Sequence, residues 1–263
     1  MNRGLVVSLV LLTAVPLAGQ DFSGIEEPLT SDRPDFTEST SIVPRGHVQV
    51  EGGYTLYRVE EEEGSTLGEV LVRIGTGERW EARIGAGSYD RIDTGVPGEE
   101  VVTGFEDPLL SVKIALTEDD PNLLPPGHPQ MAFLLGTSVP VGDDELTTDE
   151  WEPFAKLALG WDLTGRWSLS SNVNYAWVAD GDDRIHQLSA SLSNGFSLTD
   201  RLGAYLEYFA FSEETLDGPS THYVDGGFTW SVSPDLQLDA RVGFGLNDPS
   251  PDWFTGVGAA VRF

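Results

Sequence analysis

Charged side chains recur at alternate positions within apolar segments of this 263-residue chain. Near residue 50, Gln49 and Glu51 alternate with Val48 and Val50. Successive side chains of a β-strand point to opposite faces, so this spacing places acids and bases together on one polar face. The residues of that face, expected to line an interior, are Glu51, Glu69, Glu81, Asp107, Asp162, Glu207, Asp225 and Asp239, with Arg73, Arg83, Lys113, Lys156, Arg241 and Arg262.

A face with nearly balanced acids and bases supports two interpretations. The charges can neutralise one another as ion pairs, because a charge left unpaired in a protein interior is costly. They can also form a polar track that guides a solute. The sequence leaves both interpretations open.

Serine hydrolysis is the catalytic alternative. His186 and Ser189 are three residues apart in an alternating segment, so their side chains point to opposite faces and are badly placed as nucleophile and base. The His-x-Ser-Asn-Gly order of the outer-membrane phospholipases is also missing, and no phosphate-binding loop, zinc helix or dinucleotide motif occurs. We therefore expect no enzyme, no catalytic residue, no cofactor and no metal site.

Acidic residues dominate the charge of the chain. Lys+Arg 15 against Asp+Glu 43 gives a formal net charge of −28, which repels phosphate backbones and makes nucleic acid an unfavourable partner. Acidic runs at residues 60–63 and 143–145 could meet divalent cations that bridge lipopolysaccharide, since carboxylates suit Ca²⁺ and Mg²⁺. They lack the spacing of a calcium loop, which favours solvated charge. There are no cysteines, so disulfides and thiolate sites are excluded.

The elements that position these side chains have a period of two residues. Residues 236–246 alternate throughout, and residues 48–57 and 255–263 repeat the pattern. About nine more segments bring the total to about twelve, each about 10 to 12 residues long, as membrane-spanning strands require. Short turns recur at residues 76–78, 164–166, 199–201 and 233–235, with a longer proline-rich member at 118–129, and alternate with generally longer connections at 60–65, 93–103, 142–150, 180–183, 212–221 and 247–252.

Tryptophans indicate which face meets lipid. Those within the segments share the apolar face and gather near segment ends, as the aromatic girdles of a membrane barrel do; they are Trp80, Trp161, Trp167, Trp177 and Trp230, while Trp151 and Trp253 lie beside the longer connections. A soluble sandwich would hide that face instead. The predicted fold is all-β: a transmembrane antiparallel β-barrel of the outer membrane with about 12 strands.

The N-terminus predicts export. Residues 1–20 open with Arg3 and continue as a short uncharged apolar run, which is typical of a signal peptide and too short for a retained helix. Residues 21–46 form no clear strand and are expected either in the periplasm or inside the lumen, where Asp32, Arg33 and Asp35 would pair with wall charges. Residues 47–263 form the barrel, and its terminal aromatic Phe263 resembles the signal read by the barrel-assembly machinery.

Several patches resemble a known family, the outer-membrane transporter-like proteins named for the meta-pathway of phenol degradation. The matching stretches are residues 30–37 (Thr-Ser-Asp-Arg-Pro-Asp-Phe-Thr), 43–53, 104–107 with Lys113, 138–142, 207–209, 225–227 and 237–246. The resemblance implies an outer-membrane barrel loosely described as a transporter. The name of the family is weak evidence that phenol is the solute.

The predicted function is diffusion or uptake of a small solute by an outer-membrane, porin-like barrel of a Gram-negative bacterium, with aromatic or other hydrophobic compounds among the candidates. The expected partners are outer-membrane lipid and lipopolysaccharide. The alternatives are a closed structural or surface-binding barrel and, less favoured, an outer-membrane lipid hydrolase.

Overall fold

The structure is a computed structural model that describes residues 27–117, 127–248 and 250–263. The predicted signal peptide and residues 21–26 lie outside the described residues. Within them, no helix is long and apolar enough to cross a membrane. The strands are β1 (Val48–Val59), β2 (Glu62–Gly75), β3 (Trp80–Gly85), β4 (Tyr89–Asp93), β5 (Val102–Phe105), β6 (Leu109–Ala115), β7 (Gln130–Ser138), β8 (Glu152–Thr164), β9 (Trp167–Asp180), β10 (Asp183–Ser197), β11 (Leu202–Phe211), β12 (Thr221–Ser233), β13 (Leu236–Gly245) and β14 (Trp253–Arg262).

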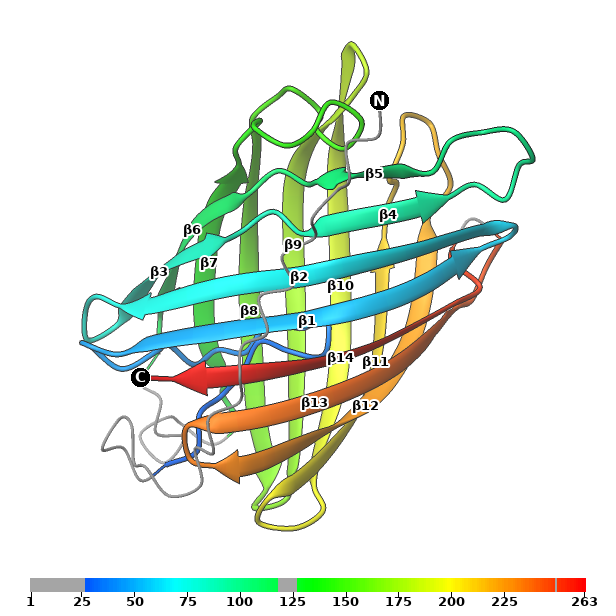
Figure 1. The fold of residues 1–263 in the computed structure, drawn as a ribbon. Coiled ribbons are helices and arrows are strands. Elements are labelled where there is room, and N and C mark those ends of the chain that lie inside the picture. The colour runs from blue at the N-terminus through cyan, green and yellow to red at the C-terminus, as the bar shows by residue number, and fades with distance from the viewer. Residues whose placement is uncertain (1–26, 118–126, 249) are drawn as a thin grey trace, which may run out of the picture.

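These strands form one closed antiparallel barrel (Figure 1). β1 pairs with β14 on one side and with β2 on the other, which closes the ring. The first and last strands are also tied by Val48 and Phe263, whose backbone N–H and C=O groups exchange hydrogen bonds of 3.1 and 2.8 Å. Closure matters because unpaired backbone groups are not tolerated in lipid.

Two wall strands are interrupted, so fourteen strands fill twelve wall positions. β2 pairs with β3 through residues 71–75 and with β4 through residues 63–67, and β5 and β6 pair with β4 and β3 in turn. β3 and β4 therefore continue one another, as do β5 and β6. This confirms the predicted barrel of about twelve strands, although the segments near residues 84 and 112 were expected to be continuous.

The interruptions have a local cause. A Cβ on Gly87 would lie 1.8 Å from the carbonyl oxygen of Glu106, so only glycine allows the two chains to approach this closely. Pro108, in the gap between β5 and β6, has no N–H to donate to a sheet ladder. The strands bend here, and β4 and β5 form a hairpin that extends from the wall (Figure 1).

Two of the six connections expected to be longer are tight turns. β1 ends at Val59 and β2 begins at Glu62, so the acidic run 60–63 lies at a hairpin tip, where Glu60 has a φ of 53°. β9 and β10 are joined just as tightly, with Gly181 at a φ of 59°. The connection expected at residues 60–65 is therefore shorter than predicted, whereas the one expected at 180–183 lies where the structure has it. Alternation alone does not show how far a strand continues into a charged stretch.

Burial is inverted relative to a soluble protein. The largest fully buried side chains include Arg73, Lys113 and Glu51, whereas Leu135 and Val257 on the opposite parity are 59% and 58% exposed. Trp80, Trp167, Trp177 and Trp230 are also exposed on the outer face. An apolar exterior around a polar interior is the arrangement that a lipid environment requires.

Candidate functional site

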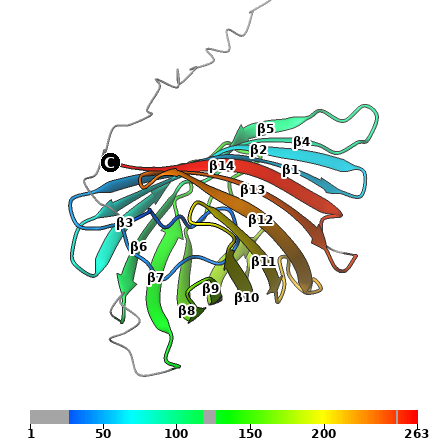
Figure 2. The same cartoon turned by 90° about the horizontal axis from the view of Figure 1, so that it is seen from below.

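The barrel interior is occupied by the chain's own residues 27–46, which we call the N-terminal segment. Figure 2 shows this segment, in dark blue, crossing the space enclosed by the strands. Its backbone is tied to the wall along its length: Leu29 N–H donates to the carbonyl of Pro234 at 2.7 Å, and Val43 N–H donates to a Glu81 carboxylate oxygen at 2.6 Å. The segment forms no strand; carbonyl groups and side chains of the wall provide hydrogen-bond partners for its backbone instead.

Asp32 of the N-terminal segment lies among three wall cations. Its carboxylate is 3.3 Å from Arg73 of β2, 2.9 Å from Arg83 of β3 and 3.1 Å from Lys113 of β6. Burial opposes ionisation, but the attraction of Arg73, Lys113 and Arg83 outweighs it and holds the pKa of Asp32 well below its ordinary value. Asp32 is therefore an anion that bridges three neighbouring wall positions.

Glu38 makes a second contact with the same side of the wall. Its carboxylate oxygens lie 2.8 Å from Arg83 and 2.5 Å from Lys156 of β8. Burial opposes ionisation, but Arg83 and Lys156 lower the pKa of Glu38 to about 2. The backbone of Glu38 also exchanges hydrogen bonds with the Asn172 amide, at 2.7 and 3.1 Å.

Arg33 binds the opposite set of charges. Its guanidinium pairs with Glu69 of β2 and lies 3.4 Å from Asp239 of β13. Glycines provide the room: a Cβ on Gly53 or Gly258 would lie 2.2 or 2.3 Å from the Arg33 guanidinium. The N-terminal segment thus presents anions to the cationic side of the lumen and a cation to acids elsewhere on the wall.

Phe36 of the N-terminal segment makes an apolar contact with the wall. The Phe36 ring stacks on Phe209 with centroids 4.6 Å apart and meets Phe211 edge-on at 5.3 Å. Phe209 in turn belongs to a buried aromatic cluster with Tyr223 and Phe254. Beside it, Glu207 accepts hydrogen bonds from the backbone N–H groups of Phe36 at 2.6 Å and Thr37 at 2.8 Å, and from the Thr37 hydroxyl.

Asp35 faces acids rather than bases. Its carboxylate accepts a hydrogen bond from Ser193 at 3.0 Å, and Ser193, Glu207 and Asp225 are directly opposite one another on β10, β11 and β12. Burial, with the nearby charge of Asp225, raises the pKa of Asp35 to about 7. A proton on Asp35 therefore favours this arrangement near neutral pH.

Most residues that alternation predicted to face the interior surround the N-terminal segment; these are Glu51, Glu69, Arg73, Glu81, Arg83, Lys113, Lys156, Glu207, Asp225, Asp239, Arg241 and Arg262. Arg241, for example, donates to the Pro34 carbonyl at 2.9 Å, and Arg262 donates to the Glu27 carbonyl at 2.8 Å. Asp32 and Arg33 form ion pairs with wall residues, whereas Asp35, which was also expected to pair with a wall charge, instead accepts a hydrogen bond from Ser193 beside acidic residues.

Two of the predicted residues lie at the margins of this interior region. Asp162 is exposed near the end of β8, where the pairing with β9 shifts register. Asp107 sits in the gap between β5 and β6 and accepts hydrogen bonds from Val141 N–H at 2.9 Å and Gly142 N–H at 2.8 Å, so it anchors the connection between β7 and β8. Asp107 also lines the cavity that contains Glu38, Arg83 and Lys156, so it faces the interior although it belongs to no strand.

The sequence reasoning missed the aromatic part of this site and Glu38. Phe209 and Phe211 share the inward parity of Glu207, so aromatics at polar-parity positions were the available signal. Two cavities remain beside the N-terminal segment. One, of ≈370 Å³, is lined by Arg33, Asp35 and several hydroxyl residues of β9, β10 and β12. The other, of ≈260 Å³, lies by the strand interruptions next to Glu38, Arg83 and Lys156.

The fold and the inverted burial define an outer-membrane β-barrel with an occupied lumen. The chain belongs to the family described as "Putative MetA-pathway of phenol degradation", whose model matches residues 31–263. No curated protein matches the chain.

Solved structures agree on the fold. The COG4313 outer membrane channel from Pseudomonas putida F1 is similar at a TM-score of 0.67 and 14% identity, over 85% of this chain and 98% of that one. The NanC porin is similar at 0.54 and 13%, over 81% and 98% of the two chains. The translocator domain of the autotransporter NalP from Neisseria meningitidis is similar at 0.52 and 13%, over 82% and 88%. At such identities the likeness concerns the barrel alone.

Proposed function

We propose that this protein is an outer-membrane channel for a small solute and that the N-terminal segment is its plug. The observation that carries the proposal is that residues 27–46 occupy a lumen lined by charged side chains, with a cavity left on each side. A solute therefore passes when the N-terminal segment shifts or leaves.

The solute class follows from two features of the lumen. Its charged groups are largely paired with one another, while Phe209, Phe211 and Tyr223 offer an aromatic surface beside them. Small neutral aromatic compounds fit that combination, and the family's description mentions phenol degradation. Phenol and a non-aromatic solute of similar size are the first pair to compare in an uptake assay.

The two alternatives rest on other features. A closed structural or surface-binding barrel would use its loops and keep the lumen filled. A lipid hydrolase would need a nucleophile and base together, but Ser189 accepts a hydrogen bond from Asn174 at 3.1 Å on the inner face, and the His186 ring is 2.7 Å from the Tyr175 hydroxyl on the outer face. This separation argues against hydrolysis by His186 and Ser189.

A reversible lock tests the channel. The hydroxyls of Thr37 and Ser191 lie 2.6 Å apart, so the pair T37C and S191C brings two thiols close enough for a disulfide between the N-terminal segment and β10. The natural chain has no cysteine, so this bond would be unambiguous. Single-channel conductance in a planar bilayer is compared between the oxidised and the reduced double variant.

The expected result is conductance steps in the wild type and in the reduced double variant, and none in the oxidised one. Each single variant, T37C or S191C, is the control and conducts under both conditions. A truncation lacking residues 21–46 is the second arm, and it conducts with larger or longer openings. Folded protein that stays silent in the wild type, the reduced variant and the truncation contradicts the channel and favours the structural barrel.

A further inference from the structure

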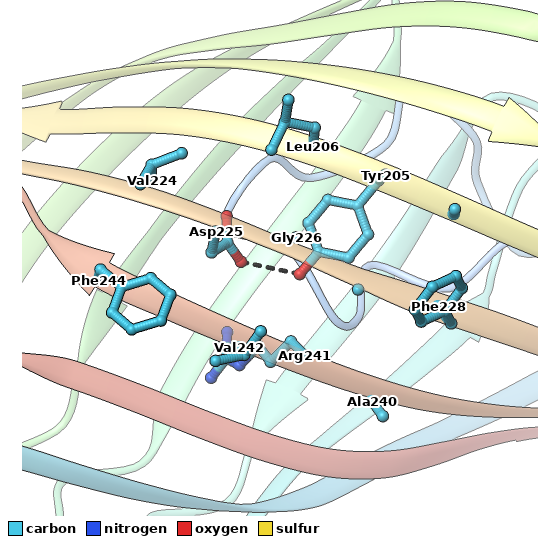
Figure 3. A pocket seen from close by; sticks show the side chains of 12 residues that line it. Tyr205, Leu206, Val224, Asp225, Gly226, Phe228, Ala240, Arg241, Val242 and Phe244 are labelled. Atoms are coloured by element: carbon cyan, nitrogen blue, oxygen red, sulfur yellow. Dashed lines mark hydrogen bonds between the residues drawn. The ribbon is translucent and has the colours of Figure 1, made fainter.

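A depression interrupts the apolar outer wall across β11, β12 and β13. Its volume is ≈620 Å³, within the range of small-ligand pockets. Its centre is Gly226 of β12, the outward-facing position that carries no side chain. Figure 3 shows Leu206, Val224, Phe228, Val242 and Phe244 around it.

The strand register explains the shape of the depression. In one row, Gly226 lies directly opposite Leu206 on β11 and Val242 on β13. In the next row, Phe228 lies opposite Ala204 and Ala240. The first row has its small residue on the middle strand, and the second row has its small residues on the two outer strands. The spaces that these small residues leave therefore join into one depression between the bulky side chains.

The lining restricts the chemistry of an occupant. Every outward-facing side chain of the depression is aliphatic, aromatic or absent. The polar groups of the same strands point the other way: the Tyr205 hydroxyl donates to Asp225 at 2.8 Å within the barrel. A ligand in the depression thus meets a predominantly apolar lining, and it gains mainly dispersion contacts rather than hydrogen bonds.

The position along β12 identifies the source of that ligand. Gly226 lies four residues from Trp230 at one end of the strand and four residues from His222 at the other. At about 3.3 Å per residue, each is about 13 Å away along the strand. Barrel strands tilt by about 35–45°, so each is about 10 Å away along the membrane normal, which places Gly226 near the middle of a hydrocarbon layer about 30 Å thick. The groups available at that depth are the chains of membrane lipids.

We propose that the depression at Gly226 is a binding site for one acyl chain of a membrane lipid. Lipid tails are as apolar as leucine, so association within a bilayer depends on close packing. A chain that enters the depression exchanges loose contacts with other chains for a fitted surface. The proposal does not depend on whether the lumen conducts.

The experiment fills the depression without touching the glycine. A Cβ on Gly226 would approach the Tyr205 carbonyl oxygen at 2.9 Å, so that position is left unchanged. The double variant A204L and A240L instead extends two outward side chains into the space. The matched control, A190L and A259L, adds the same side chains to outward positions on β10 and β14 outside the depression.

Each protein is folded in dioleoylphosphatidylcholine vesicles, extracted with mild detergent and examined by native mass spectrometry for retained lipid. Heat-dependent migration on gels verifies folding. We expect the wild type and the control to retain one phosphatidylcholine molecule that the filled variant loses. Equal retention by the filled variant, or no retained lipid on the folded wild type, overturns the proposal.

Discussion

Gly53 of β1 and Gly258 of β14 are directly paired at the seam where the barrel closes, and the Arg33 guanidinium occupies the space that their side chains would fill. A larger residue at either position forces Arg33 away from Glu69 and Asp239. We expect G53V to loosen the N-terminal segment and to increase the frequency of channel opening. Conductance recordings check this directly.

The control for that prediction is a glycine with free space around it. A Cβ on Gly165, in the turn between β8 and β9, meets nothing within 4 Å, so G165A should behave as the wild type. Unchanged opening in folded G53V would show that Arg33 does not hold the segment in place.

Removing the Arg33 charge should weaken docking of the N-terminal segment more strongly than G53V does. R33M leaves Glu69 and Asp239 without this partner, and the Arg33 side chain is only 12% exposed. Breaking a buried ion pair from one side costs about 3–5 kcal/mol. Hydrogen–deuterium exchange of the amides in residues 27–46 should rise accordingly, and the double variant R33M and E69Q should recover part of the protection. Exchange in R33M at the wild-type rate would contradict this assignment.

Docking of the N-terminal segment should depend on pH with a defined sign. The pKa of Asp35 is raised from an ordinary value of 3.8 to about 7, so docking takes up a proton, and that stabilisation is lost as pH rises from about 4 through 7. The pKa of Glu38 is lowered from 4.5 to about 2, so its stabilisation is present above 4.5 and lost as pH falls toward 2. Docking should be tightest near pH 4 to 5 and weaker at pH 8.

A spin label on the segment measures this dependence. Mobility of a label at T30C, an exposed position of the segment, should be higher at pH 8 than at pH 5, and D35N should flatten the difference because Asn holds no titrating proton. Glu207 and Asp225, which face Asp35 across the row, stay unchanged in that variant. The same mobility at both pH values in a chain with Asp35 intact would rule out the carboxyl as the responsive group.

The aromatic contact provides a prediction without charge. F36A removes a partly buried ring that stacks on Phe209, at a cost of about 2–3 kcal/mol for docking. Limited proteolysis should cut within residues 27–46 faster in F36A, while F36L should lie between F36A and the wild type. If F36L were cut as fast as F36A, stacking of the Phe36 ring would contribute more to docking of the segment than the apolar area that the side chain buries.

Much of the fold follows from the sequence because a barrel wall is a local pattern. The alternation of Gln49, Glu51 and their valine neighbours is visible in the chain and assigns a face to each side chain. The same parity rule placed Arg73, Lys113 and Glu207 on the inner face, where the structure has them. It did not show that Asp107 lies in the gap between β5 and β6, or that Asp162 is exposed near the end of β8.

The sequence by itself determined the alternating strands, their inner and outer faces and the charges available inside. Only the tertiary structure decided which charges meet: Asp32 with Arg73, Arg83 and Lys113 is set by how β2, β3 and β6 lie around the ring. Periodicity is a property of neighbouring residues, whereas Gly53 and Gly258 are brought together by ring closure across most of the chain. That closure follows from the requirement that every backbone group in the membrane find a partner, whereas the enclosed segment is held by its contacts with the wall.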